Sequence, residues 1–155
     1  MATFRFRAAA ALEARAKQEQ AASLVFSQCE ALLRGGEARH AEAEQVRQRA
    51  VDDDAAAARA GMNAVARDWH RNWITTTSAV VGHLHTEVER LGADAARAKR
   101  AWQDARRRRL VLERLRDRAW RRFQVAEHRR DMKTMDELAQ VRFGIVAAEQ
   151  RRTGV

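Results

Sequence analysis

The chain has 155 residues, a formal net charge of +9, seven glycines, one cysteine and no proline. Charged residues make up 33% and aromatic residues only 6% of it, a composition that indicates long helices or coiled coils and excludes a thick globular core. The basic excess leaves three kinds of acidic partner open: a nucleic acid, an anionic membrane and an acidic protein surface.

The first residues carry arginines and a short alanine run that ends at Glu13. This is not the pattern of a secretory signal, and no stretch of the chain approaches the roughly 20 apolar residues that span a bilayer. The single Cys29 can form no internal disulfide and fits a reducing compartment. We therefore expect a cytoplasmic protein without a transmembrane segment.

A first helix is predicted for residues 5–60. Steps of three and four residues trace a thin stripe of mostly small and apolar side chains, flanked by Phe26 and Leu33. The stripe comprises Ala8, Ala11, Arg15, Gln18, Ala22, Val25, Cys29, Leu32, Gly36, Arg39, Ala43, Val46, Ala50, Asp53 and Ala57. Gly35 and Gly36 are expected to weaken this helix, since each glycine costs about 1 kcal/mol relative to alanine.

The chain is predicted to turn within residues 58–79. Gly61 and the run Thr75–Ser78 are the two candidate centres, because β-branched residues in a row are poor helix formers. Trp69 and Trp73 lie four residues apart in this stretch and share one helix face. They either anchor a partner or wedge the turn against the first helix, and the sequence leaves both interpretations open.

A second helix is predicted for residues 79–150. A regular 4-3 spacing indicates a left-handed coiled coil through Leu84, Val88, Leu91, Ala95, Ala98, Trp102 and Ala105. In the same frame the stripe then becomes half basic, through Arg109, Leu112, Arg116, Ala119, Phe123, Ala126, Arg130 and Lys133. Two such helices predict one all-α domain over residues 1–155, a long antiparallel two-helix coiled-coil hairpin with both termini at one end.

The adjacent acids Asp136 and Glu137 could suggest a catalytic pair or a metal site. On a helix, however, neighbouring side chains diverge by about 100°, so the two carboxylates cannot share a proton or grip one cation. Lys133 is instead placed to pair with them along the helix surface. The chain also lacks a GxxxxGK[ST] phosphate loop and a GxSxG nucleophile turn, so we expect no enzyme, catalytic residue, metal or cofactor.

A strongly basic region extends from Arg97 to Arg130, with fourteen basic residues against four acids. Its run Arg106–Arg109 points all round a helix, since successive residues are about 100° apart, and so forms no groove-facing stripe. A solvated face or an acidic protein socket accounts for it better than a nucleic acid, which is not expected as a partner.

Both ends of the chain resemble the FliJ family. The start Phe4-Arg5-Phe6-Arg7, followed by Leu12 and Arg15, is similar to the family's opening F-x-F/Y-x-L-x-x-L-L-x-x-R, with Ala9 in place of its first leucine. A second set is similar to the family's closing Q-K-x-L-D-E-x-A-x-x-R, namely Lys133, Asp136, Glu137, Ala139 and Arg142. Met135 replaces a leucine of that motif, and the region of Trp69 and Trp73 differs from the family's phenylalanine- or tyrosine-led loop.

The resemblance implies a non-enzymatic stalk of a flagellar type III protein export ATPase complex. The paired chain ends would enter the hexameric ATPase ring and stimulate it, and the other end would reach the export-gate membrane protein or export chaperones. Ring-facing residues would be Phe4, Phe6, Arg7, Leu12, Arg15, Lys133, Asp136, Glu137 and Arg142. Gate- or chaperone-facing residues would be Trp69 and Trp73, and the first three ring-facing residues would lie near the last four.

The location implied is the cytoplasm, at the inner face of the cell membrane. The equivalent stalk of a virulence injectisome is the nearest alternative. A basic coiled-coil protein that binds nucleic acid is the alternative from a different class.

Overall fold

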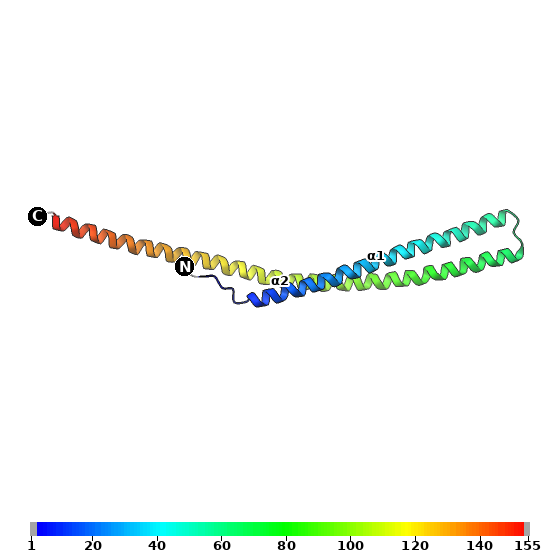
Figure 1. The fold of residues 1–155 in the computed structure, drawn as a ribbon, viewed down its shortest axis with the longest axis horizontal. Coiled ribbons are helices and arrows are strands. Elements are labelled where there is room, and N and C mark those ends of the chain that lie inside the picture. Colours follow the sequence, from blue (N-terminus) through cyan, green and yellow to red (C-terminus); the bar gives the residue numbers. More distant parts are fainter. Residues whose placement is uncertain (1–2, 154–155) are drawn as a thin grey trace. The chain divides into compact units, whose positions relative to one another are not determined.

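The computed structural model describes residues 3–153, with side-chain surroundings for residues 3–147. It contains two helices, α1 (Ala9–Arg59) and α2 (Ala64–Thr153), and no strand among the described residues (Figure 1). The predicted all-α, two-helix fold is confirmed. Both helices run without interruption because the chain has no proline and is rich in good helix formers.

The chain turns at residues 60–63, around Gly61, one of the two predicted centres. Gly61 has a φ of +88°, a left-handed conformation that glycine adopts without strain. The Met62 N–H donates to the carbonyl of Ala57 at 3.3 Å, so the hydrogen bonds that close the end of α1 are satisfied within the chain.

The prediction that the second helix begins near residue 79 is wrong, because α2 begins at Ala64. The Oδ1 of Asn63 accepts a hydrogen bond from the Ala66 N–H at 2.8 Å. An asparagine at this position satisfies a backbone donor that the first helical turn leaves free. The start of α2 is therefore encoded by one capping side chain.

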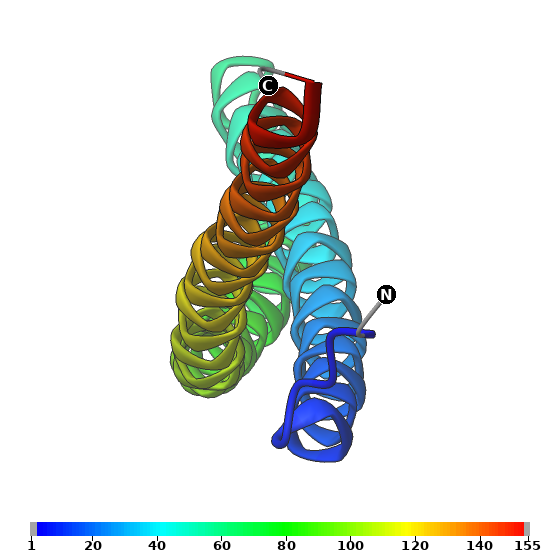
Figure 2. The same cartoon turned by 90° about the vertical axis from the view of Figure 1, so that its left-hand side faces the viewer.

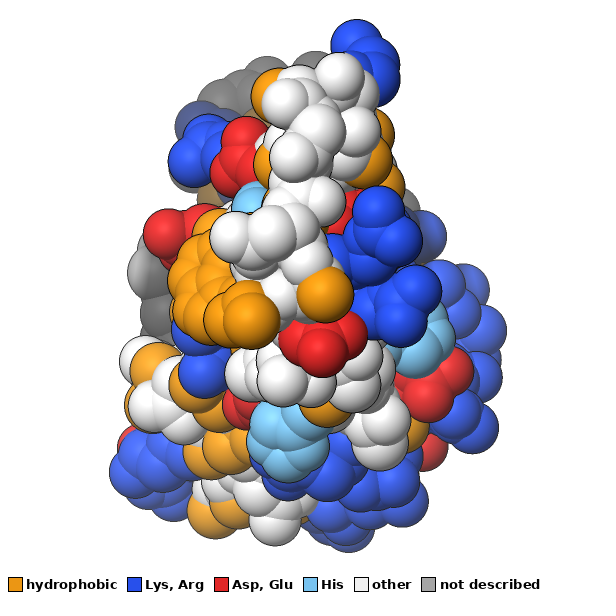
Figure 3. Space-filling view, turned by 90° about the vertical axis from the view of Figure 1, so that its right-hand side faces the viewer, with side chains coloured by type: hydrophobic (Ala, Val, Ile, Leu, Met, Phe, Trp, Pro, Cys, Tyr) orange, Lys and Arg blue, Asp and Glu red, His pale blue; other side chains and the backbone are white. Residues whose placement is uncertain are grey.

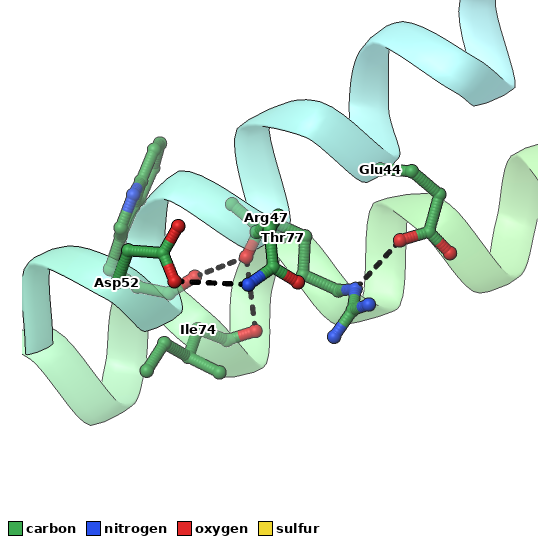
Figure 4. A network of polar contacts seen from close by, with 7 residues as sticks. Glu44, Arg47, Asp52, Ile74 and Thr77 are labelled. Atoms are coloured by element: carbon green, nitrogen blue, oxygen red, sulfur yellow. Dashed lines mark hydrogen bonds and ion pairs between the residues drawn. The ribbon is translucent and has the colours of Figure 1, made fainter. Parts of the chain in front are cut away.

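The threonine run, the other predicted turn centre, lies inside α2. Thr77 is only 6% exposed, and its hydroxyl lies 3.0 Å from the carbonyl oxygen of Trp73. The same hydroxyl lies 3.1 Å from the carbonyl oxygen of Ile74, as Figure 4 shows. Thr75 and Thr76 donate in the same way to the carbonyls four residues earlier, at 2.8 Å each. These bonds satisfy the hydroxyls without a break in the helix.

The chain divides into two units, which are described separately. The hairpin unit comprises Ala16–Arg107, and the terminal unit combines Met1–Arg15 with Arg108–Val155.

In the hairpin unit the two helices run antiparallel on either side of the turn (Figure 1). Far from the turn, the ring of Phe26 stacks on that of Trp102, with centroids 5.7 Å apart. Closer to the turn, Arg39 forms an ion pair with Glu87 at 3.1 Å. Exposed ion pairs of this kind contribute about 0–1 kcal/mol, so the seam of side chains between the helices carries most of the stability.

The seam of α1 differs in register from the predicted stripe. Every second predicted position, such as Cys29 and Gly36, does face α2, but the positions between them shift by one residue. The less exposed residues there are Phe26, Leu33, His40, Arg47 and Asp54 rather than Val25, Leu32, Arg39, Val46 and Asp53. Steps of three and of four both stay on one helix face, so only the fit to α2 selects between them.

The seam of α2 follows the predicted spacing more closely. All seven positions from Leu84 to Ala105 are buried or half-buried. In the terminal unit, Arg109, Leu112, Ala119 and Phe123 are half-buried as well. The remaining predicted positions are exposed, namely Arg116, Ala126, Arg130 and Lys133. Within the terminal unit, the predicted seam positions of α2 are therefore half-buried up to Phe123, apart from Arg116, and exposed after it.

Gly36 is buried in the seam of the hairpin unit. A Cβ at this position would lie 2.9 Å from the Cδ1 of Leu91 and 3.5 Å from the Cγ2 of Val88. Nothing lies within 4 Å of the equivalent point at Gly35. The two adjacent glycines therefore have opposite surroundings, one in the seam and one in solvent.

We expect Asn63→Ala to lower the free energy of unfolding by about 1 kcal/mol, because it removes the cap of α2. Urea denaturation followed by circular dichroism measures this change. Asn63→Asp keeps an acceptor at the same point and is the control, with little loss expected. Equal losses in the two variants would contradict the capping role.

Leucine at the two glycines should have opposite effects. We expect Gly35→Leu to raise the free energy of unfolding by about 0.5–1 kcal/mol through helix propensity. Gly36→Leu should lower it by about 1–3 kcal/mol, because the added side chain overpacks the seam at Leu91. The same denaturation measurement compares them, and stabilisation by both would show that the seam at Gly36 is open.

Candidate partner-binding surfaces

The N-terminal segment of the terminal unit lies on an aromatic pair of α2. Residues 3–8 precede the first turn of α1 as a non-helical segment, visible in Figure 2 as the dark blue coil. The ring of Phe4 meets Trp120 edge to face at 5.1 Å and Phe123 at 5.6 Å. Trp120 and Phe123 stack at 5.7 Å, three residues apart on the helix. Such pairs contribute about 0.5–1.5 kcal/mol beyond the area they bury.

This contact corrects one expectation about the chain ends. Phe4 lies against Trp120 and Phe123, not against the acids of the closing motif. Lys133 is ten residues beyond Phe123, which is about 15 Å along a helix. Of the other opening residues, Phe6, Leu12 and Arg15 are half-buried and Arg7 is exposed.

The closing motif lies on a fully exposed stretch of α2, residues 131–147, which we call the C-terminal arm. Every side chain of this arm is exposed. Lys133 pairs with Glu137 at 3.8 Å, four residues apart, while Asp136 and Arg142 project from the same stretch. The structure thus gathers these four residues on one helical segment.

The arm also carries apolar residues that are not among the predicted ring-facing residues. Met135 is 66%, Leu138 58% and Phe143 77% exposed. One shallow hollow on the arm is lined by Met135, Leu138, Ala139, Val141, Arg142, Phe143 and Val146. Met135, Ala139, Phe143 and Val146 follow steps of four, four and three residues. This spacing was the available signal, since it is typical of a helix face that packs on a partner. Exposed apolar residues in a row often mark an interaction surface.

Trp69 and Trp73 form the main aromatic surface near the turn. Their rings stack with centroids 6.4 Å apart, and they are 62% and 43% exposed. Val65, 80% exposed, lies one turn before Trp69. Figure 3 shows the turn end, where hydrophobic side chains gather beside basic and acidic ones. Trp73 also lines a hollow together with Ala43 and Val46 of α1, so it faces both solvent and the first helix.

Among the described residues, no group of three or more His, Cys, Asp or Glu side chains could hold a metal ion. No described helix is apolar over a sufficient length to cross a membrane.

The fold and its exposed surfaces define a coiled-coil protein with exposed apolar and charged helix faces. The family model described as Flagellar FliJ protein matches residues 9–145, and the chain belongs to this family. The match includes the closing motif and begins after Phe4, Phe6 and Arg7. No curated protein and no solved structure matches the chain.

Membership of this family gives the chain a general role. FliJ proteins belong to flagellar export, a type III secretion process, where they act as a stalk or coupling component without catalysis. Their interactions are, in general, with the export ATPase and the export gate. The resemblance found in the sequence is therefore confirmed.

Photo-crosslinking can test the placement of Phe4. We expect benzoylphenylalanine in place of Phe4 to crosslink to tryptic peptides 119–121 and 123–129, which contain Trp120 and Phe123. The same photoreactive residue in place of the exposed Phe143 is the control and should not reach these peptides within one chain. Crosslinks from position 4 to peptide 134–142, identified by mass spectrometry, would contradict the structure and restore the earlier expectation.

Proposed function

We propose that this chain is the central stalk of a flagellar type III export ATPase complex. The terminal unit engages the hexameric ATPase ring and raises its activity, and the turn end of the hairpin unit meets the export-gate membrane protein. The chain itself hydrolyses no nucleotide. It acts in the cytoplasm, at the inner face of the cell membrane, and export chaperones are further candidate partners for the tryptophan surface.

The observation that carries the proposal is the exposed C-terminal arm. A stretch of seventeen residues, 131–147, is helical and wholly exposed, although it holds apolar side chains as large as Leu138 and Phe143. An isolated helix of this kind gains stability by packing its apolar side on another protein. The arm also contains the residues that match the family's closing motif.

Charge supports the same assignment. Lys133, Asp136, Glu137 and Arg142 place charges of both signs along the arm. Exposed charges of both signs steer association and fix register more than they add affinity. A small apolar contact surrounded by charged residues suits a partner that must bind and dissociate repeatedly. The FliJ family matched by the chain is flagellar, which supports the flagellar machine over the injectisome.

The turn end supports a second contact. Two stacked tryptophans that remain about half exposed are typical anchors, because truncation of buried interface tryptophans often costs 2 kcal/mol or more, as a rough rule. Their partial contact with α1 through Trp73 holds the ring in place before binding, which reduces the entropy lost on association.

Stimulation of the ATPase tests the role of the arm. We expect the double variant Met135→Ala/Leu138→Ala to raise the concentration that half-maximally stimulates the purified ring at least about tenfold, since each truncation removes roughly 1 kcal/mol of apolar contact. Val25→Ala/Leu32→Ala is the matched control, because these side chains are 51% and 60% exposed on α1. It should stimulate like the unchanged chain.

The proposal fails if the unchanged chain neither stimulates the ring nor elutes with it in size-exclusion chromatography. The assignment to the arm fails if the two double variants weaken stimulation equally. Circular dichroism of each variant establishes that helix content is unchanged.

A further inference from the structure

The arginines of α2 between residues 109 and 130 fall into two groups. Arg109, Arg116 and Arg130 each form an ion pair with an acid of the same helix. The acids are Glu113, Asp117 at 3.3 Å and Glu127 at 2.7 Å, respectively. Their positive charge is thus largely compensated by the chain itself.

The second group has no such compensation. Five arginines are exposed and make no hydrogen bond or ion pair with any described residue. They are Arg114, Arg118, Arg121, Arg122 and Arg129. At about 100° per residue, all five lie within about 100° of arc on one side of the helix. We call this side the arginine face.

The arginine face lies opposite the contact side of α2. The half-buried residues of the same stretch, including Leu112, Ala119 and Phe123, centre on the other side of the helix at this residue spacing. The acids Glu113, Asp117, Glu127 and Asp131 also lie off the face. Concentrated charge of one sign is therefore directed to solvent.

Apolar side chains interleave with these arginines. Val111 is 56%, Val125 52% and Met132 50% exposed, and their spacing places them on the same side of the helix. A shallow hollow there is lined by Arg121, Arg122, Val125, Ala126 and Arg129. The arginine face therefore combines guanidinium groups with exposed apolar side chains.

We propose that the arginine face binds the surface of an anionic phospholipid bilayer, with this part of α2 lying along it. Guanidinium groups bind phosphate oxygens in a bidentate manner, and five of them over about 22 Å of helix can reach headgroups simultaneously. Val111, Val125 and Met132 then contact the acyl boundary, as in interfacial helices. Each arginine strengthens binding to an anionic surface by about fivefold.

Two other acidic partners fit the face less well. A protein ring encloses a helix and calls for uncompensated charge on several sides, whereas the free arginines occupy one side, which suits a flat surface. A nucleic acid offers phosphates, but its backbone offers nothing to the interleaved Val111, Val125 and Met132. This binding goes beyond the proposed stalk role and does not depend on it.

Vesicle co-sedimentation of the full chain tests the proposal. We expect binding to phosphatidylcholine vesicles that contain a quarter of phosphatidylglycerol, and none to vesicles of phosphatidylcholine alone. Arg118→Gln/Arg122→Gln should weaken binding roughly thirtyfold. Arg116→Gln/Arg130→Gln removes the same charge from the compensated group and should weaken it less than about threefold.

A further variant tests the apolar part. Val125→Ser leaves the charge unchanged and should still weaken vesicle binding measurably, with helix content unchanged in circular dichroism. The proposal is overturned if both arginine pairs weaken binding equally, or if neutral vesicles bind as well. It is also overturned if a DNA duplex binds more tightly than vesicles at equal salt and with the same dependence on Arg118 and Arg122. Stimulation of the ATPase ring is a separate readout, so failure of either proposal is recognised independently.

Discussion

The close approach of two helix backbones at small residues is the constraint on which the hairpin unit depends. Among the side chains described, the apolar ones that are less than a tenth exposed are Ala50, Leu91 and Ala95. Few large groups are buried, so stability comes from many short van der Waals contacts along a narrow seam. Gly36 exemplifies this dependence, because Leu91 occupies the space that a side chain there would need.

The terminal unit does not depend on a close approach of helix backbones. The contact with the N-terminal segment is an aromatic one, between Phe4 and the pair Trp120 and Phe123, and the arm beyond it has no buried side chain among residues 131–147. Surface that the chain does not cover itself is thereby left for other molecules. The hollow on the arm and the arginine face use different residues, so one helix can present two chemically distinct surfaces.

The sequence was sufficient for the fold class and for the seam of α2, because Leu84 to Ala105 repeat without exception. It was insufficient for the register of α1, where small residues follow both spacings and only the partner helix favours Phe26 and Leu33. The sequence predicts the turn correctly at Gly61, one of two candidate centres, but the alternative turn at the threonine run is wrong. The threonine hydroxyls donate to backbone carbonyls of α2, which propensity alone does not reveal.

The candidate functional surfaces could likewise be predicted from the sequence only in part. The residues of the closing motif could be recognised because they match a pattern, and the family match includes them. The apolar residues of the arm could not be recognised as a binding surface, because in the sequence they look like residues of a buried seam. Only their exposure in the structure distinguishes them. The arginine face is hard to recognise in the sequence, because the run Arg106–Arg109 is the more conspicuous feature of the basic region. The division between Arg116, which is paired, and Arg118, which is free, is visible only in three dimensions.

The narrow seam has a thermal consequence. The heat capacity of a protein rises on unfolding in proportion to the apolar surface that becomes hydrated. A hairpin whose contacts are largely alanine, glycine and half-buried side chains exposes little such surface, so this increment should be small for its length. Its stability curve is accordingly shallow, and the paired helices should respond gently to warming or cooling around the temperature of greatest stability.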